Sequence, residues 1–335
     1  MQYLKKLHSL FFVGALFVLT SACKGDKDLQ STGTKAVADK PASTVLVSGN
    51  LNSVGSDTLN NLMTLWAESF NEIHPGVQIQ IEGKGSSTAP PALIEGTAQL
   101  GPMSRAMKEE ELDKFEKEFG YKPTQIRVAL DALAVFVNKD NPVKGLSLKQ
   151  IDSIFSSTYQ RGGSPIARWG QVEGSAWQEG EAPTAWKNEA ISLYGRNSAS
   201  GTYGYFKKVA LKKGDYKSNV KEQPGSSAVV QGIGSDLYGI GYSGIGYLTS
   251  GVRAIAISDG GELFEPTLDN CISGDYPLAR FLYVYINKAP NKPLDELTRK
   301  FLEFVVSEKG QEIVRKDGYF ALPEKIIEEE LDKLN

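Results

Sequence analysis

The chain has 335 residues, of which 37 are Lys or Arg and 40 are Asp or Glu, so its formal net charge is −3 at pH 7. A net negative protein is a poor candidate for nucleic-acid binding, which relies on concentrated positive charge. The sequence holds only two cysteines and two histidines, which argues against a disulfide framework and a histidine-rich metal site.

The first residues have the pattern of a secretory signal. Lys5 and Lys6 precede an apolar run over residues 10–19, which is too short to span a membrane. Residues 19–23 resemble a bacterial lipoprotein cleavage box that ends at Cys23. We therefore expect residues 1–22 to be a lipoprotein signal peptide. Cys23 would carry the lipid that anchors the chain to a membrane of the cell envelope, facing the periplasm or the cell surface.

The next segment, residues 23–43, is rich in Lys, Asp, Ser, Thr and Gly and has almost no large apolar residue. This composition indicates a flexible tether. Roughly 290 residues follow, which is more than a single hydrophobic core usually holds, so two lobes are expected. Cys271 in this part is expected to be a quiet, buried thiol.

The first third of the folded part alternates between strand and helix patterns. Leu62, Trp66 and Phe70 belong to an apolar series at helical spacing, whereas Val77, Ile79 and Ile81 alternate with polar residues. The patterns predict a strand at 45–48, a helix at 58–73, a strand at 77–82, a short helix at 92–96 and a strand near 99–101. This order implies an α/β lobe with loops at one edge of a parallel sheet, where ligands bind.

The remainder of the chain predicts a second lobe and a return to the first. Two charge-rich runs, residues 108–111 and 328–330, are expected to be solvated helix faces. Residues 161–187 are polar, rich in Gly and Pro, and contain three tryptophans, and we expect a long surface excursion there without an assigned function. The other predicted elements are strands at 128–138, 191–194, 238–242, 253–258 and 281–287, helices at 146–155 and 203–210, and a long helix or broken pair at 294–316.

Three short loops rich in Gly, Ser and Thr each lead into a predicted helix start, at residues 55–58, 85–88 and 196–202. Helix N-termini carry unpaired N–H groups and a partial positive charge. Three such ends that meet could hold a small oxyanion without a metal, and Arg196 could pair with it in two-pronged fashion. Phosphate is the first candidate. The alternative is that the serines merely cap their helices.

The sequence gives little support to an enzyme. His8 lies in the signal, so His74 is the one histidine of the mature chain, in a motif that resembles a helix stop. Residues 83–87 lack the spacing of a P-loop, and no complete G-x-G-x-x-G opens a dinucleotide site. A phosphoester hydrolase that used Ser56, Ser86 or Ser200 would lack a histidine base. We expect a binding protein with no catalytic residues, cofactor or metal.

Many short motifs, in order along the chain, resemble those of the substrate-binding proteins of phosphate ABC transporters. They occupy residues 55–58, 66–70, 74–77, 85–87, 101–105, 133–138, 141–142, 154–155, 169–170, 196–202, 239–242 and 310–319. The resemblance implies a type II periplasmic-binding-protein fold, in which two α/β lobes are joined by a two-strand hinge with the ligand cleft between them. Lobe one would comprise residues 44–135 and 285–335, and lobe two residues 136–284.

The resemblance also implies that the chain is a monomer that binds inorganic phosphate and delivers it to an ABC transporter permease. Alternatives are a binding protein for another oxyanion such as sulfate, or a phosphate-sensing or adhesive lipoprotein without a permease. The loops and the family motifs together give the candidate phosphate-binding residues: Ser56, Asp57, Thr58, Leu59, Ser86, Ser87, Ser104, Arg105, Arg196, Ser198, Ser200, Gly201 and Thr202.

Two of these positions depart from the family pattern. Ser104 and Ser198 stand where relatives place Asp. Phosphate at neutral pH keeps a proton, and a carboxylate that accepts it discriminates against sulfate. Asp57 is the nearest replacement acceptor, although it could instead be a helix N-cap. Arg105 could be a cation of the cleft or a surface residue.

Overall fold

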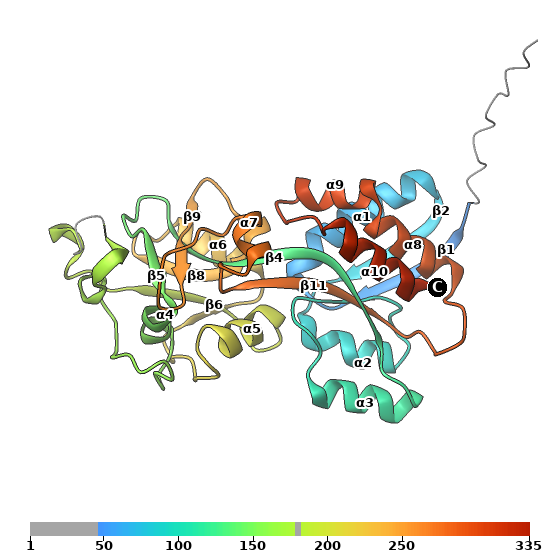
Figure 1. Ribbon diagram of the computed structural model, residues 1–335, viewed down its shortest axis with the longest axis horizontal. Coiled ribbons are helices and arrows are strands. Elements are labelled where there is room, and N and C mark those ends of the chain that lie inside the picture. The colour runs from blue at the N-terminus through green and yellow to red at the C-terminus, as the bar shows by residue number, and fades with distance from the viewer. Residues whose placement is uncertain (1–45, 178–181) are drawn as a thin grey trace, which may run out of the picture. The chain divides into compact units, whose positions relative to one another are not determined.

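The computed structural model describes residues 46–177 and 182–335. The predicted signal peptide, the tether and Cys23 lie outside the described residues. Along the described chain, strands and helices alternate as the patterns predict, and Figure 1 shows them gathered into two groups connected by two long strands. The two-lobed α/β architecture is thereby confirmed, while the lobe boundaries at residues 135–136 and 284–285 stay a prediction.

Lobe one begins with two parallel strands, β1 (Ser48–Val54) and β2 (Gly76–Glu82), which pair from Ser48↔Gly76 to Val54↔Glu82. The first residue of the predicted strand at 45–48 lies outside the described residues, and only Ser48 of the others belongs to β1. The strand lies further along the chain than predicted and buries Leu51 and Ser53 among polar neighbours. The remaining elements of this lobe are α1 (Asn60–Ile73), α2 (Ala89–Ile94), β3 (Gly101–Met103), α3 (Glu109–Phe119), α8 (Glu296–Val306), α9 (Glu308–Lys316) and α10 (Glu324–Leu334).

Two antiparallel strands cross between the lobes. β4 (Thr124–Asn138) and β11 (Ala279–Ile286) pair from Ile286↔Thr124 to Ala279↔Ala132, and the two run side by side in Figure 1. Beyond Ala132, β4 instead pairs with strands of lobe two. Its burial is almost continuous from Val128 onward, as expected for a strand that is covered on both faces.

Lobe two adds β6 (Ser192–Arg196), β7 (Lys221–Gln223), β8 (Gly239–Gly244) and β9 (Val252–Ala254) to the same sheet. The strand order is β3-β11-β4-β8-β6-β7, with β9 also paired to β4. Its parallel pairs, β6–β8 and β6–β7, fit the expected α/β pattern, whereas β4 pairs antiparallel with its neighbours. The other elements are β5 (Gly145–Ser147), α4 (Leu148–Phe155), α5 (Gly201–Val209), α6 (Ser226–Gly234), β10 (Ala256–Ser258) and α7 (Leu268–Ser273).

Most described residues of the segment 161–187 are exposed, as the predicted surface excursion requires, but two of its tryptophans are buried. Trp169 and Trp177 are buried, with ring centroids 6.2 Å apart, and Trp186 packs against Trp169 and Tyr238. The apolar area of the tryptophan rings outweighs the polar residues between them. The tryptophan rings therefore join the hydrophobic core.

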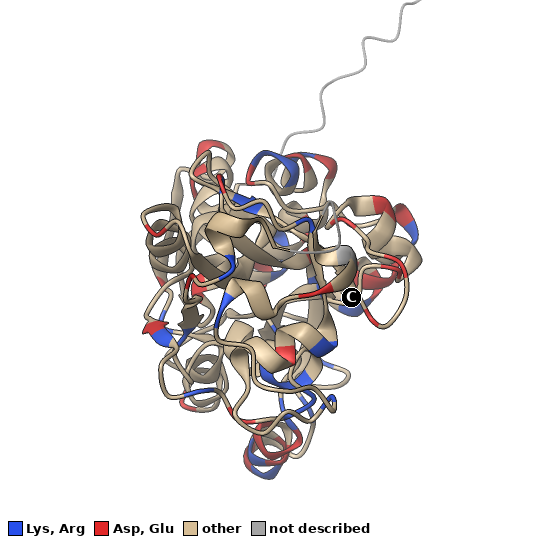
Figure 2. Cartoon of the chain, turned by 90° about the vertical axis from the view of Figure 1, so that its left-hand side faces the viewer, with Lys and Arg blue, Asp and Glu red and all other residues tan. Residues whose placement is uncertain are grey.

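The charge-rich runs are also only partly solvated. Glu330 on α10 is fully buried and pairs with Arg127, and Glu111 on α3 pairs with Arg105. A buried carboxylate needs such a partner. Elsewhere Lys or Arg and Asp or Glu are interspersed over the side of the protein that Figure 2 turns to the viewer.

Candidate functional site

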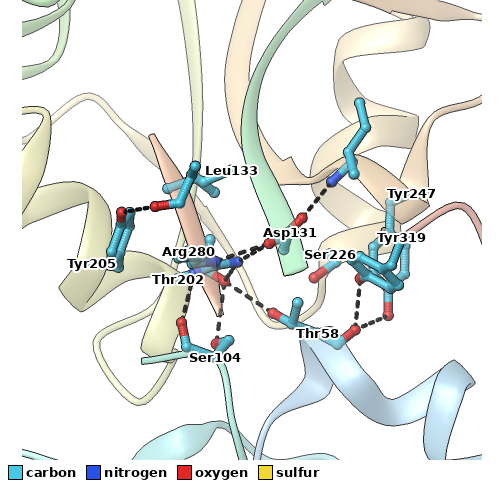
Figure 3. Close-up of polar contacts among 12 residues, drawn as sticks. Thr58, Ser104, Asp131, Leu133, Thr202, Tyr205, Ser226, Tyr247, Arg280 and Tyr319 are labelled. Carbon is cyan, nitrogen blue, oxygen red and sulfur yellow. Dashed lines mark hydrogen bonds and ion pairs between the residues drawn. The ribbon is translucent and has the colours of Figure 1, made fainter. Parts of the chain in front are cut away.

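Four hydroxyl side chains, three from the predicted loops and one from Ser104 after β3, meet where the two lobes touch. Thr58 Oγ1 lies 2.9 Å from Thr202 Oγ1, Ser86 Oγ lies 3.2 Å from Ser104 Oγ, and Ser104 Oγ lies 3.5 Å from Thr202 Oγ1. All four residues are at most 1% exposed. We call Thr58, Ser86, Ser104 and Thr202 the hydroxyl cluster. Figure 3 shows Thr58, Ser104 and Thr202 pointing toward one another.

The cluster is assembled by strand–turn–helix units. Thr58 lies in the short 3₁₀ turn Asp57–Leu59 that leads into α1, and Ser86 opens the turn Ser86–Thr88 that leads into α2. Ser104 follows β3 and donates its N–H to Ser86 Oγ at 3.0 Å. Thr202 lies in the first turn of α5. Lobe one thus supplies three hydroxyls and lobe two the fourth.

Glycine permits the close approach of the lobes. Gly85 has a φ of +112°, and a Cβ there would lie 2.6 Å from Ala199 O of lobe two. A Cβ on Gly201 would meet Ser86 Oγ and would lie 2.6 Å from Ser104 Oγ. Side chains at either position would therefore hold the two loops apart.

The serines differ in what they do for their helices. Ser200 caps α5, since its Oγ accepts from the N–H groups of Thr202 at 3.1 Å and Tyr203 at 3.4 Å. Ser56 precedes the turn before α1 and makes no side-chain cap. Ser86 instead accepts from Ser104. The capping alternative is therefore confirmed for Ser200 only.

Arg196 lies at the end of β6 and is 1% exposed. Its Nη1 donates to Ser226 Oγ at 2.6 Å, and its Nη2 donates to Pro224 O at 3.2 Å. Its Nε is buried without a hydrogen-bond partner among the described residues. Burial lowers the pKa of Arg196, and the nearby Asp57 carboxylate opposes this shift. A buried guanidinium N–H without a hydrogen-bond acceptor costs free energy, so this N–H indicates a position for an acceptor atom of a ligand.

Asp57 connects the lobes and does not cap its own helix. Its Oδ1 lies 3.1 Å from Arg196 Nη2 and accepts from the N–H of Ser226 at 2.7 Å. Ser226 is the first residue of α6, so a lobe-one carboxylate holds the positive end of a lobe-two helix. Tyr247 Oη also donates to Asp57 O at 2.9 Å. The N-cap alternative at the start of its own helix was therefore wrong.

The hydroxyl cluster also contacts an ion pair, which the loop motifs did not reveal. Arg280 of β11 and Asp131 of β4 are cross-strand partners, with Nε donating to Asp131 Oδ2 at 2.9 Å. Arg280 also donates through Nη1 to Ser104 O at 2.9 Å and through Nη2 to Thr202 Oγ1 at 3.0 Å. One guanidinium thus contacts a cluster residue of each lobe, Ser104 of lobe one and Thr202 of lobe two (Figure 3).

The sequence did contain a signal for this pair. Asp131 interrupts a long apolar strand and Arg280 begins another, and charges inside such strands need buried partners. Asp131 is 0% exposed, and its Oδ1 accepts from the N–H of Ile245 at 3.0 Å. Burial raises the pKa of the Asp131 carboxyl, although Arg280 and the Ile245 N–H oppose the shift.

Arg105 is a cleft residue that is already paired. It is 8% exposed and binds Glu111 in two-pronged fashion, with both N···O distances at 2.7 Å. Its Nη2 also donates to Ser87 Oγ at 3.2 Å. Burial raises the pKa of the Glu111 carboxyl, but the hydrogen bonds from Arg105 and from the Lys108 N–H lower it by more. The net shift of the Glu111 pKa is therefore downward.

The other candidates lie around the cluster. Leu59 is buried, and its N–H donates to Ser56 O at 3.3 Å. The N–H of Ser87 donates across the lobes to Ala199 O at 3.1 Å. Ser198 is exposed and lines a cavity of about 790 Å³ beside the cluster, together with Ser87, Arg105, Ser200 and Arg280.

The remaining reactive groups have structural roles. His74 ends α1, and its Nδ1 accepts from the N–H of Val47 at 3.4 Å. Cys271 is a buried free thiol, and burial raises its pKa to about 12. Within residues 46–177 and 182–335, no group of three or more His, Cys, Asp or Glu is arranged to hold a metal ion. In the same ranges, no helix has the length and apolar character needed to cross a bilayer.

The chain is similar to proteins of a known family. A model of the PBP superfamily domain matches residues 33–309. The phosphate-binding protein PstS of Pseudomonas aeruginosa is 55% identical over 291 residues, covering 86% of this chain and 88% of that protein. PstS of Staphylococcus haemolyticus is 28% identical, covering 95% and 92%.

Solved structures share the fold. A possible phosphate-binding protein from Planctomyces limnophilus has a TM-score of 0.61 and 27% identity, covering 86% of this chain and 98% of that one. A putative phosphate ABC transporter substrate-binding protein from Clostridium perfringens, solved with bound phosphate, has a TM-score of 0.67 and 24% identity, covering 82% and 100%.

Proposed function

The chain belongs to the PstS-type phosphate-binding proteins of the PBP superfamily, and we propose that it binds inorganic phosphate between its lobes and delivers it to an ABC-type import permease. The protein is a binding protein and not an enzyme. The observation that carries the proposal is the buried hydroxyl cluster, which combines side chains of both lobes next to two buried arginines.

The site chemistry suits a hydrated dianion that must lose its water. Hydroxyls and helix-start N–H groups donate to phosphate oxygens, and charge-assisted bonds of this kind contribute roughly 1.5–3 kcal/mol each. Arg196 and Arg280 are each paired with a carboxylate, Asp57 and Asp131. Each pair balances the charge of its arginine, so neither arginine is a lone buried charge.

Preference for phosphate over sulfate requires a group that accepts the phosphate proton. Ser104 offers a hydroxyl, which can accept as well as donate, and Asp57 lies beside Arg196 with 23% of its side chain exposed. We assign the accepting role to Asp57, with Ser104 as an additional acceptor. Substitution of Asp57 by Asn should therefore reduce the preference for phosphate over sulfate.

The remaining candidates are assigned by their neighbours. Residues 200–202 supply the start of α5, and Thr58, Leu59 and Ser86 supply donors from lobe one. Ser56, Ser87, Arg105 and Ser198 surround the site. We propose in addition that residues 1–22 are removed as a signal peptide and that lipid on Cys23 anchors a monomer in the cell envelope.

The proposal is tested by calorimetric titration of Arg196→Ala with phosphate. Removal of this guanidinium should weaken phosphate binding by about 10- to 100-fold, corresponding to about 1.5–3 kcal/mol. The matched control is Arg299→Ala, because Arg299 pairs with Glu303 along the surface of α8. Equal phosphate affinity in both variants would contradict an oxyanion site at Arg196.

A further inference from the structure

The entrance to the candidate phosphate site has a surplus of positive charge. The residues that line the cavity there include no Asp or Glu, but they include six cationic side chains. Four of these have a carboxylate partner, in the pairs Lys108–Glu110, Arg105–Glu111, Lys207–Asp215 and Arg280–Asp131. The other two, Lys208 and Lys213, are exposed and have no ion-pair partner within the part of the chain that the structure describes. We call Lys208 and Lys213 the rim lysines.

The backbone holds Lys213 at this entrance in an unfavourable conformation. Lys212 and Lys213 have φ angles of +50° and +66°, in the left-handed region that disfavours residues with a Cβ. The Lys213 N–H donates to Lys207 O at 2.8 Å and so keeps the turn beside the end of α5. Glycine would adopt the same φ without strain. Fold stability alone therefore does not explain a lysine at this position.

The rim lysines are placed to act on phosphate at a distance. Both are exposed, whereas the four hydroxyls of the cluster are buried. The chain as a whole has a net charge of −3, so its overall charge does not attract a phosphate dianion. Unpaired cations at an entrance do attract an approaching anion over roughly a Debye length, about 8 Å at 0.15 M salt. Weakly polarisable walls, here including Phe281, strengthen such a local field.

We propose that Lys208 and Lys213 steer inorganic phosphate into the interlobe site and so increase its association rate constant, without contacting the bound ion. This inference rests on the proposed phosphate site and adds the residues that set its rate of capture. Lys108 and Lys207 contribute less, because the carboxylates of Glu110 and Asp215 cancel most of their field. Charges at the rim of a site act mainly on association and on its salt dependence.

The test replaces both rim lysines in the full chain, stripped of bound ligand, with Lys208→Gln/Lys213→Gln. A chase of bound radiolabelled phosphate with unlabelled phosphate gives the dissociation rate constant. This constant divided by the Kd from calorimetric titration gives the association rate constant. At about 0.01 M salt, where the Debye length is about 30 Å, the association rate constant should fall by at least about threefold. The dissociation rate constant should stay within about twofold of the parent value, and the difference in association should disappear at about 1 M salt.

The matched control is Lys292→Gln/Lys325→Gln, which removes the same charge from exposed positions that do not line the cavity. The control should keep the parent's association rate constant at both salt concentrations. An equal loss in the control would overturn the inference, because net charge and not the rim would then set the rate. An unchanged association rate constant in the rim variant would also overturn it. So would a loss confined to the dissociation rate constant, because the lysines would then contact the bound ion.

A single variant, Lys213→Gly, separates the charge of Lys213 from its place in the turn. Glycine relieves the left-handed strain, so the midpoint of urea unfolding should rise, while the association rate constant at low salt should fall by about twofold. Capture as fast as that of the parent would overturn the role of Lys213. If the parent itself does not bind phosphate, the proposed function fails and the inference fails with it, whereas every other contrary result leaves the phosphate receptor standing.

Discussion

Arg280 joins three parts of the site through one side chain. It pairs with Asp131, donates to the carbonyl of Ser104 in lobe one, and donates to the hydroxyl of Thr202 in lobe two. Because its guanidinium pairs with Asp131 across β4 and β11, Arg280 positions the Ser104 backbone and the Thr202 hydroxyl relative to each other. The ion pair between Arg196 of lobe two and Asp57 of lobe one is a second contact between the lobes.

We predict that Arg280→Gln weakens phosphate binding by about 10- to 100-fold, because the variant loses a charge-assisted contact and the restraint on Thr202. Arg253→Gln is the matched control, since Arg253 is also partly buried and donates to backbone carbonyls of Asn141 and Val143 within lobe two. Titration of both variants with phosphate checks the prediction. Equal affinities would show that Arg280 serves the fold alone.

At the scale of elements, much of the secondary structure could be read from periodicity. The apolar series in α1 and the alternation in β2 were sufficient to predict these two elements. The predicted broken helix pair at 294–316 is divided at Ser307, whose Oγ accepts from the Gly310 N–H and caps α9. The prediction of a strand at 45–48 missed most of β1, because the residues of β1 are largely polar and give no apolar pattern. The exposure of most residues in segment 161–187 was predictable, but the burial of Trp169 and Trp177 was not, because ring burial depends on tertiary partners that composition does not show.

Part of the site was predictable for a similar reason. Loop motifs report on local helix starts, so they located Thr58, Ser86 and Thr202. The Arg280–Asp131 pair arises from register between strands that lie far apart in the sequence. Only their presence in apolar strands hinted at it, and one sequence cannot specify which strands pair.

A helix junction in lobe one supplies a pH prediction. Asp317 at the end of α9 accepts a hydrogen bond from Asn61 near the start of α1, and burial raises its pKa from 3.8 to about 6. The folded chain then holds a proton that the unfolded chain has already lost between about pH 4 and pH 6. The free energy of unfolding should therefore fall as pH rises through this window.

We expect Asp317→Asn to remove this fall and to raise the free energy of unfolding at pH 7, by less than the pKa shift alone would give because the side chain is partly exposed to solvent. Urea unfolding at pH 4 and pH 7 measures the effect, and the two proteins should differ least at pH 4. Asp332→Asn, at an exposed position of α10, is the control. A variant that is less stable than the parent at pH 7 would contradict the assignment.

At the scale of the whole molecule, ligand capture depends on how closely the lobes approach. Gly201 of lobe two faces Ser86 and Ser104 of lobe one, and an added Cβ would meet both hydroxyls. Three lobe-one hydroxyls and one lobe-two hydroxyl form the cluster, so separation of the lobes divides it. Reopening of this contact gives the ligand a route out.

We predict that Gly201→Ala prevents full closure and weakens phosphate binding by at least about tenfold, even though alanine suits the start of a helix. Gly204→Ala is a matched control on the same helix, because a Cβ there would make an ordinary 3.6 Å contact with Arg105. Phosphate titration and small-angle scattering with saturating phosphate check the two effects. If Gly201→Ala binds like the parent and has the same radius of gyration, closure does not depend on this contact.

The most direct test of the account is calorimetric titration of the ligand-stripped chain with phosphate at neutral pH, followed by sulfate competition. We expect one phosphate to bind per chain, with a Kd in the micromolar range or below, about −8 kcal/mol or stronger, and little displacement by sulfate. No heat or saturation with phosphate would contradict the central claim that the buried hydroxyls and arginines between the lobes form a phosphate site.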